Sequence, residues 1–169
     1  MAIRDILTYP NKFLRKQARP VKDVDGDLQK IIADMGETMY AAPGAGLASI
    51  QIGVEQSIMV YDLTPKDERR SLQVLINPRI VSQEGQVISE NEGCLSVPDF
   101  RADVKRASQI VVEGLDRNGN PLRLDAEGYF AIILQHELDH LNGALFIDHL
   151  SSLKRGLFKR HLKKKLSLK

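Results

Sequence analysis

The sequence predicts an α+β fold in a single domain, residues 1–169, with antiparallel sheets packed around a central helix and a basic C-terminal helix over residues 151–169. Segments rich in Val and Ile fill the middle third of the chain, and Gly, Pro, Asn and Asp separate them, as in strands joined by turns. Two other stretches carry apolar residues at the three- and four-residue spacing of helices. No repeat, low-complexity tract or linker divides the chain, and 169 residues can bury a core without disulfides.

The first third of the chain predicts a short helical turn and an amphipathic helix. Residues 9–15 are typical of a turn that leads into one helical turn, because proline is tolerated where a helix starts. A helix from Asp27 to about Tyr40 is predicted behind an Asp cap. Its apolar positions are Leu28, Ile31, Ile32, Met35 and Met39. Proline and two glycines in residues 41–46 then predict a tight loop whose backbone can approach another group closely.

Six strands are predicted in the middle of the chain. They cover residues 57–63, 73–80 with an interruption at Asn77-Pro78, 86–89, 94–97, 108–115 and 121–125. The Asn118-Gly119 pair favours the positive φ angles of a hairpin turn, so the last two of these strands are expected to form a hairpin.

Two helices are predicted in the last third. Residues 127–141 are apolar on most of a helix circumference, which indicates a buried helix, and Gly143 is the residue type that ends one. A short apolar segment, residues 144–147, leads to a last helix that begins at Ser151 or Ser152.

The last helix concentrates the positive charge of the chain. Eight of the 24 Lys and Arg residues lie in residues 154–169, which contain no acidic residue. The rest of the chain, the body, therefore has 16 basic and 22 acidic residues and a net charge of −6. Apolar residues at helical spacing predict that one side of this helix packs on the body. They are Leu153, Leu157, Phe158, Leu162 and Leu166.

The composition predicts a cytoplasmic protein that binds neither DNA nor a membrane. No apolar run approaches the roughly 18 residues that span a bilayer, and the first residues do not form an export signal. The single cysteine, Cys94, excludes an intramolecular disulfide and fits a reducing compartment.

The strongest motif is His136-Glu137-x-x-His140, within the predicted buried helix. Residues four apart lie on one helix face, so His136 and His140 can hold one metal ion, and Glu137 lies roughly a quarter turn away. This pattern is typical of zinc-dependent hydrolases in which the glutamate is the general base. A catalytic site of this kind needs a third protein ligand and one open position.

Two familiar completions of the motif are excluded. In the longer pattern that ends in a third histidine, that position holds Phe146, and no glutamate occurs after Glu137 to act as the ligand of thermolysin-like enzymes. The downstream alternatives are Asp148, His149 and His161, although we expect the two histidines to be a surface residue and a tail residue. Cys94 is the upstream candidate, against its alternative role as a small buried apolar side chain.

The sequence resembles the peptide deformylases in three ordered motifs. That family carries Gly-x-Gly-Leu-Ala-Ala-x-Gln, Glu-Gly-Cys-Leu-Ser and Gln-His-Glu-x-Asp-His-Leu-x-Gly. Here they are residues 44–51, 92–96 and 135–143, and the one departure is Ser49 in place of the second alanine. The resemblance covers nearly the whole chain in size and element order.

The resemblance implies an enzyme that removes the N-formyl group from the initiator methionine of nascent peptides and releases formate. Cys94, His136 and His140 would bind the metal, and Glu137 would act as base and then acid while a metal-bound water attacks the formyl carbonyl. The Leu95 backbone amide and the Gln51 side chain would stabilise the oxyanion.

We expect the substrate to lie along the glycine-containing loop and beside the metal helix. Ile132, Ile133 and Tyr129 precede His136 by four, three and seven residues, so they can form the wall of a methionine pocket, with plain core packing as the alternative. The full set of predicted substrate contacts is Gly44, Gly46, Glu92, Gly93, Arg101, Tyr129, Ile132 and Ile133.

Ligand chemistry alone suggests zinc, whereas the resemblance implies Fe(II), so we expect one Fe(II) per chain with Zn(II) or another divalent metal as the alternative. Because the substrate emerges from the ribosome, the basic helix predicts weak contact with ribosomal RNA, against a solvated face or a membrane-surface helix. Two other functions are weighed: a zinc peptidase that cleaves unmodified peptides, and an RNA-binding module with a structural metal.

Overall fold

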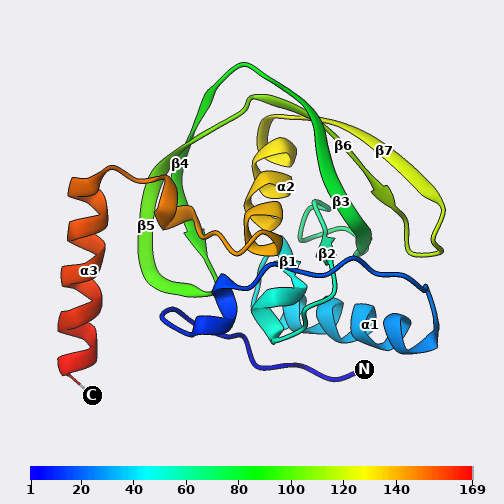
Figure 1. Cartoon of the computed structure of the whole chain (residues 1–169), viewed down its shortest axis with the longest axis horizontal. Coiled ribbons are helices and arrows are strands. Elements are labelled where there is room, and N and C mark those ends of the chain that lie inside the picture. Colours follow the sequence, from blue (N-terminus) through cyan, green and yellow to red (C-terminus); the bar gives the residue numbers. More distant parts are fainter. Residues whose placement is uncertain (169) are drawn as a thin grey trace.

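A computed structural model describes residues 1–168 and has the predicted α+β fold (Figure 1). A five-stranded antiparallel sheet has the strand order β1-β2-β3-β6-β7, and β4 and β5 form a separate hairpin. The strands are β1 (Gly46–Ala48), β2 (Ile58–Tyr61), β3 (Gln73–Glu84), β4 (Val87–Cys94), β5 (Val97–Arg106), β6 (Gln109–Leu115) and β7 (Pro121–Glu127). The helices are α1 (Gly26–Ala41), α2 (Gly128–Leu141) and α3 (Ser152–Ser167), with 3-10 turns at Lys12–Arg15, Ser49–Ile52 and Phe146–His149.

Helix α2 lies between the β4–β5 hairpin and the larger sheet (Figure 1). All four residues of β2 are buried, because successive side chains on a strand point to opposite faces and both faces of this sheet are covered. Ile58 and Val60 pack in the core that contains the apolar side of α1, whereas Met59 and Tyr61 pack in the core that contains α2. The predicted central helix is therefore held by apolar packing on the sheet.

The helix ends follow their sequence signals. The Asp25 carboxylate accepts a hydrogen bond from the Leu28 backbone N–H at 2.9 Å, so the predicted Asp cap is Asp25 and α1 begins at Gly26. Gly143 follows the end of α2 with a φ of 75°, where a Cβ would lie 2.5 Å from the Arg15 carbonyl oxygen. Glycine is required there for both reasons.

The strand predictions need four corrections. The predicted strand 94–97 is wrong, because Cys94 ends β4, Leu95 and Ser96 form a turn, and Val97 begins β5. Most of β5 was missed, since it is half-exposed and its first residues include Pro98 and Asp99, which are typical of turns. A short strand, β1, lies where only a loop was expected, and β3 continues to Glu84 beyond a register shift at the predicted interruption.

Helix α3 packs on the body less than its leucines predicted. Phe158 is buried against Tyr9 and Phe100, with ring centroids 5.3 and 4.9 Å apart, and Leu162 is partly buried beside it. By contrast, Leu153, Leu157 and Leu166 are 71%, 49% and 51% exposed. The helix stands at the side of the molecule in Figure 1 and contacts the body through an aromatic cluster and the ion pair between Lys165 and Asp99.

Within residues 1–168, no helix is long and apolar enough to cross a membrane.

Candidate active site

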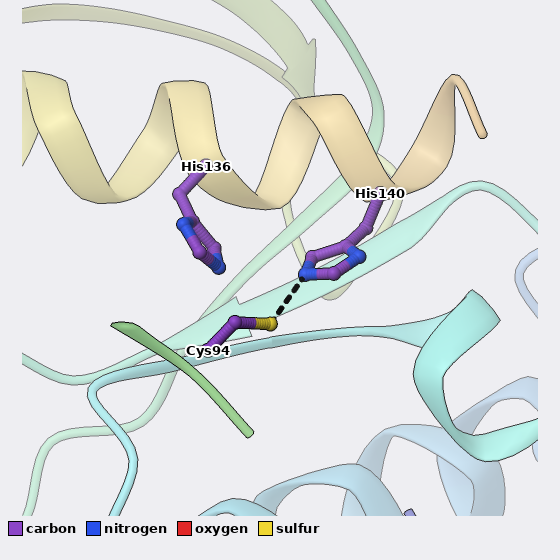
Figure 2. A group of neighbouring side chains, drawn as sticks. All are labelled: Cys94, His136 and His140. Carbon is purple, nitrogen blue, oxygen red and sulfur yellow. Dashed lines mark hydrogen bonds between the residues drawn. The ribbon is translucent and has the colours of Figure 1, made fainter. Parts of the chain in front are cut away.

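Three side chains that could bind a metal ion meet where the β4–β5 hairpin approaches α2. One ligand atom from each of Cys94, His136 and His140 lies within 4.8 Å of the others. Figure 2 shows the thiol from the end of β4 turned toward the two rings from α2, with 3.2 Å between Cys94 Sγ and His140 Nε2. The helical spacing therefore places the two histidines together. Strand β4 ends at Cys94, where the turn at Leu95 begins, and the Cys94 thiol faces the two histidines.

The downstream candidates for the third ligand have other partners. Asp148 forms an ion pair with Arg15 at 2.6 Å, and His149 Nε2 lies 2.7 Å from an Asp139 oxygen. The His161 ring lies beside Phe100, with 6.0 Å between centroids. Of the candidates weighed from the sequence, Cys94 is the one that lies with His136 and His140.

The donor set fits a divalent transition metal. A thiolate and two imidazoles suit Zn(II) or Fe(II), and a 3.2 Å separation of sulfur and nitrogen allows both atoms to contact one ion. Burial would raise the pKa of the Cys94 thiol, but the neighbouring His140 and His136 outweigh it and lower that pKa to about 5. The cysteine is thus held as the thiolate, which is the metal-binding form.

Glu92 holds one of the two histidines in place. Its carboxylate lies 2.7 Å from His136 Nδ1, which leaves Nε2 of that ring for a metal. Burial would raise the pKa of Glu92, but hydrogen bonds from His136 and Arg106 lower it to about 2. Although Glu92 lines the cleft as a predicted substrate contact, both of its oxygens bind groups of the protein.

Glu137 is a buried carboxylate beside the three ligands. Its side chain is 5% exposed, and within residues 1–168 its Oε2 has no hydrogen-bond partner. Burial raises the pKa of Glu137 above its ordinary value of 4.5. A carboxylate with a raised pKa and a free oxygen next to a metal site is suited to accept and return a proton.

A cleft of about 430 Å³ opens above this group. Every site residue predicted from the sequence lines it except His140, which is 1% exposed and lies beneath. The lining residues from the prediction are Gly44, Gly46, Gln51, Glu92, Gly93, Cys94, Leu95, Arg101, Tyr129, Ile132, Ile133, His136 and Glu137. Ile133 is 6% exposed at the inner wall, whereas Tyr129, at 65%, lies at the mouth.

Comparison with known proteins identifies the family. A family model for polypeptide deformylase matches residues 3–156. The chain belongs to the polypeptide deformylase family. It is 50% identical over 166 residues to a peptide deformylase of Desulfosudis oleivorans, with 98% of this chain and 96% of the relative covered. A peptide deformylase of Syntrophobacter fumaroxidans is 51% identical over 166 residues, with 98% and 97% covered.

Solved deformylase structures have the same fold along nearly the whole chain. A peptide deformylase from Legionella pneumophila has a TM-score of 0.91 at 47% identity, with 99% of this chain and 97% of that chain covered. One from Ehrlichia chaffeensis in complex with actinonin has a TM-score of 0.90 at 39% identity, with 98% of each covered. The predicted family, fold and enzyme class, a metal-dependent hydrolase that removes the N-formyl group from nascent peptides, are confirmed.

Gln51, the predicted oxyanion donor, is buried in this deformylase site. It is 2% exposed, and its Oε1 accepts a hydrogen bond from the Ala48 backbone N–H at 2.9 Å. Its Nε2 donates to Ser96 Oγ at 3.1 Å and lies 3.8 Å from Cys94 Sγ. The amide is fixed at its oxygen, so its Nε2 faces Ser96 and Cys94.

Sequence reasoning did not assign a role to Arg106 or Asp139, which link Glu92 to the far side of α2. Asp139 is the aspartate of the third motif, and its presence in that motif could have indicated that it has a partner. Arg106 lies in the missed strand β5 and gave no such signal.

Proposed function

We propose that this cleft hydrolyses the formyl amide of N-formylmethionyl nascent peptides on a metal held by Cys94, His136 and His140. The observation that carries the assignment is the meeting of these three donors at one cleft with Glu137, whose Oε2 has no hydrogen-bond partner within residues 1–168. A bound divalent metal supplies Lewis acidity, which lowers the pKa of a water and polarises a carbonyl.

Glu137 is the group that moves the proton. In its ionised form it accepts the proton of the attacking water, and it then returns that proton to the departing amine. Burial raises the pKa of Glu137, so the carboxyl group binds the proton more tightly between the two transfers. Gln51 Nε2 and the Leu95 backbone N–H would donate to the oxygen on which negative charge develops, and each such donor contributes roughly 3 kcal/mol.

The peptide backbone would pair with the edge of the large sheet. Strand β1 is the first strand of that sheet and pairs with β2 on one side, and its other side borders the cleft. An extended peptide that adds to such an edge gains backbone hydrogen bonds. Gly44 and Gly46 line the cleft at this edge, and the lack of a side chain at each leaves room for Leu95 and Glu137, whose atoms lie 2.9 and 2.7 Å from where a Cβ would be.

Ile132 and Ile133 would form the wall of the methionine pocket. Because Ile133 is nearly buried at the inner wall, we expect Ile133→Trp to fill the pocket and raise KM for formyl-Met-Ala-Ser, with a smaller change in kcat. Ile3→Trp is the matched control, with KM unchanged, because Ile3 is 68% exposed and lies outside the cleft. A wild-type KM for Ile133→Trp would show that Ile133 is only core.

We infer that the resident metal is Fe(II). The thiolate of Cys94 and two imidazoles accept either iron or zinc, and the family resemblance favours iron. We expect enzyme prepared without oxygen to lose activity in air as the iron or the thiolate oxidises, while a zinc-loaded sample keeps a lower but constant rate. Native protein with tightly held zinc and no sensitivity to oxygen would contradict this assignment.

Formate release distinguishes the proposed reaction from peptidase activity. Wild-type enzyme should release formate from formyl-Met-Ala-Ser and leave the acetylated and free peptides intact. Cleavage of the unmodified peptide backbone would favour the zinc peptidase.

The basic helix would contact ribosomal RNA weakly. Lys159, Arg160, Lys163 and Lys164 are exposed, whereas Lys165 pairs with Asp99 at 2.6 Å. Replacing these four exposed cations with glutamine should reduce co-sedimentation with ribosomes at low salt and flatten its salt dependence. Leu153→Ala on the same helix is the control. Deleting the residues after Leu157 would be a less specific test than substitution, because the deletion would also remove the buried Phe158. Unchanged co-sedimentation of the substituted protein would exclude the contact.

A further inference from the structure

A chain of hydrogen bonds connects His136 to the opposite side of α2. His136 Nδ1 lies 2.7 Å from Glu92 Oε1, and the same oxygen accepts a hydrogen bond from Arg106 Nη2 at 2.5 Å. Arg106 Nη1 donates to Asp139 Oδ2 at 2.7 Å, and His149 Nε2 lies 2.7 Å from that oxygen. Each contact is within hydrogen-bonding distance, so five side chains from β4, β5, α2 and the turn at Phe146–His149 form one network.

Arg106 is the central member of the network. It is 5% exposed and binds two carboxylates, with two hydrogen bonds to Glu92 and one to Asp139. The two hydrogen bonds to Glu92 fix the orientation of the Arg106 guanidinium. The hydrogen bond to Asp139 holds the guanidinium from its other side. Any displacement of Arg106 is therefore passed to the oxygen that holds His136.

His149 contacts the outer end of the network. The side chain of Asp139 is 21% exposed, so water can compete for its oxygens. His149 and Arg106 both bind Oδ2 of Asp139, which holds that oxygen between them. A hollow of about 450 Å³, lined in part by Arg106, Gln135, Asp139 and His149, gives water access to this end.

We propose that His149 is a positioning residue for the metal site, acting through Asp139, Arg106 and Glu92 on His136. The sequence indicated only a surface histidine at this position. The inference rests on the proposed role of His136 as a metal ligand. When His149 is lost, Asp139 can turn toward the hollow, Arg106 loses its second anchor, and the ring of His136 gains freedom.

The expected effect is on metal retention more than on substrate binding. Loss of a direct partner of a ligating histidine typically costs 10- to 100-fold in metal affinity or activity, and His149 acts from two residues further away. We therefore expect a metal dissociation rate about fivefold higher, with KM for the formyl peptide unchanged, because His149 lies outside the cleft.

The test compares His149→Phe with His149→Gln. Phenylalanine keeps a planar ring but removes the N–H donor, whereas glutamine places an amide N–H about as far from the backbone as the histidine Nε2. Each protein is loaded with Co(II), and loss of its thiolate absorption to excess EDTA gives the dissociation rate. The control is Arg15→Ala, which breaks the ion pair with the neighbouring Asp148 and leaves Asp139 untouched.

We expect faster Co(II) loss for His149→Phe and rates within about twofold of wild type for His149→Gln and Arg15→Ala. A wild-type rate for His149→Phe would overturn the proposal. Equal acceleration in all three variants, or in both His149 variants, would also overturn it, because loosening of the turn or lost packing would then be the cause. Failure of the proposed metal site would appear instead in the wild-type protein, as failure to bind Co(II) or release formate.

Discussion

Glu137→Ala is expected to retain its metal and lose formate release from formyl-Met-Ala-Ser. The three donors Cys94, His136 and His140 are unchanged in this variant, so metal content should match wild type. The group proposed to carry the proton is removed, and general acid–base catalysis typically contributes about a hundred- to ten-thousand-fold. Formate and bound metal are measured on the same preparation, so that lost turnover is separated from lost metal.

The matched control is Glu127→Ala, which removes a glutamate from the position just before α2. Glu127 is exposed and its side chain makes no capping hydrogen bond, so both activity and metal content should stay at wild-type values. Thermal unfolding of the two variants then shows whether Glu137→Ala acts through stability. Wild-type turnover in Glu137→Ala would exclude Glu137 as the proton carrier.

Helix α2 was predictable because two kinds of pattern agree on it. Its apolar residues recur around most of a helix circumference, and His136, Glu137 and His140 have helical spacing. Gly143 added a stop signal that the structure explains by positive φ and close contact with Arg15. Local patterns of this kind do not depend on distant parts of the chain.

The hairpin that carries Cys94 was less predictable. Its strands are polar and half-exposed, and the residues that turn the chain lie beside the cysteine itself. A strand was therefore predicted over residues 94–97, where the turn occurs. The resemblance indicated Cys94 as a ligand, although the local structure that presents it was predicted wrongly.

The network behind α2 could not be predicted from one sequence. Glu92, Arg106, Asp139 and His149 come from four elements, and their contacts depend on how β5 packs beside α2. No periodicity or motif spacing connects such residues. The exposure of the leucines of α3 was unpredictable for the same reason. Their spacing predicted an apolar side of the helix, but it could not show whether the body extends far enough to cover that side.

Gly46→Ala is expected to lower kcat about a hundredfold while the metal is retained. A Cβ at position 46 would lie 2.7 Å from Glu137 Oε1 and 3.0 Å from its Cγ, so β1 and Glu137 cannot both keep their positions. Glu137 is the proposed proton carrier, and a displacement of about 1 Å of such a group can cost about 100-fold. Gly26→Ala, whose Cβ meets nothing within 4 Å, is the control for glycine replacement.

A double-mutant cycle identifies how Gly46 acts. If the new methyl group acts only by displacing Glu137, adding Gly46→Ala to Glu137→Ala should cause no further loss of kcat, because the group it displaces is already absent. If it acts by blocking the peptide backbone at the edge of β1, KM should rise by the same factor in both backgrounds. We expect the first result for kcat, since the closest atoms to the added methyl belong to Glu137. Fully additive losses in kcat would show that the requirement for glycine at this position is independent of the proton carrier.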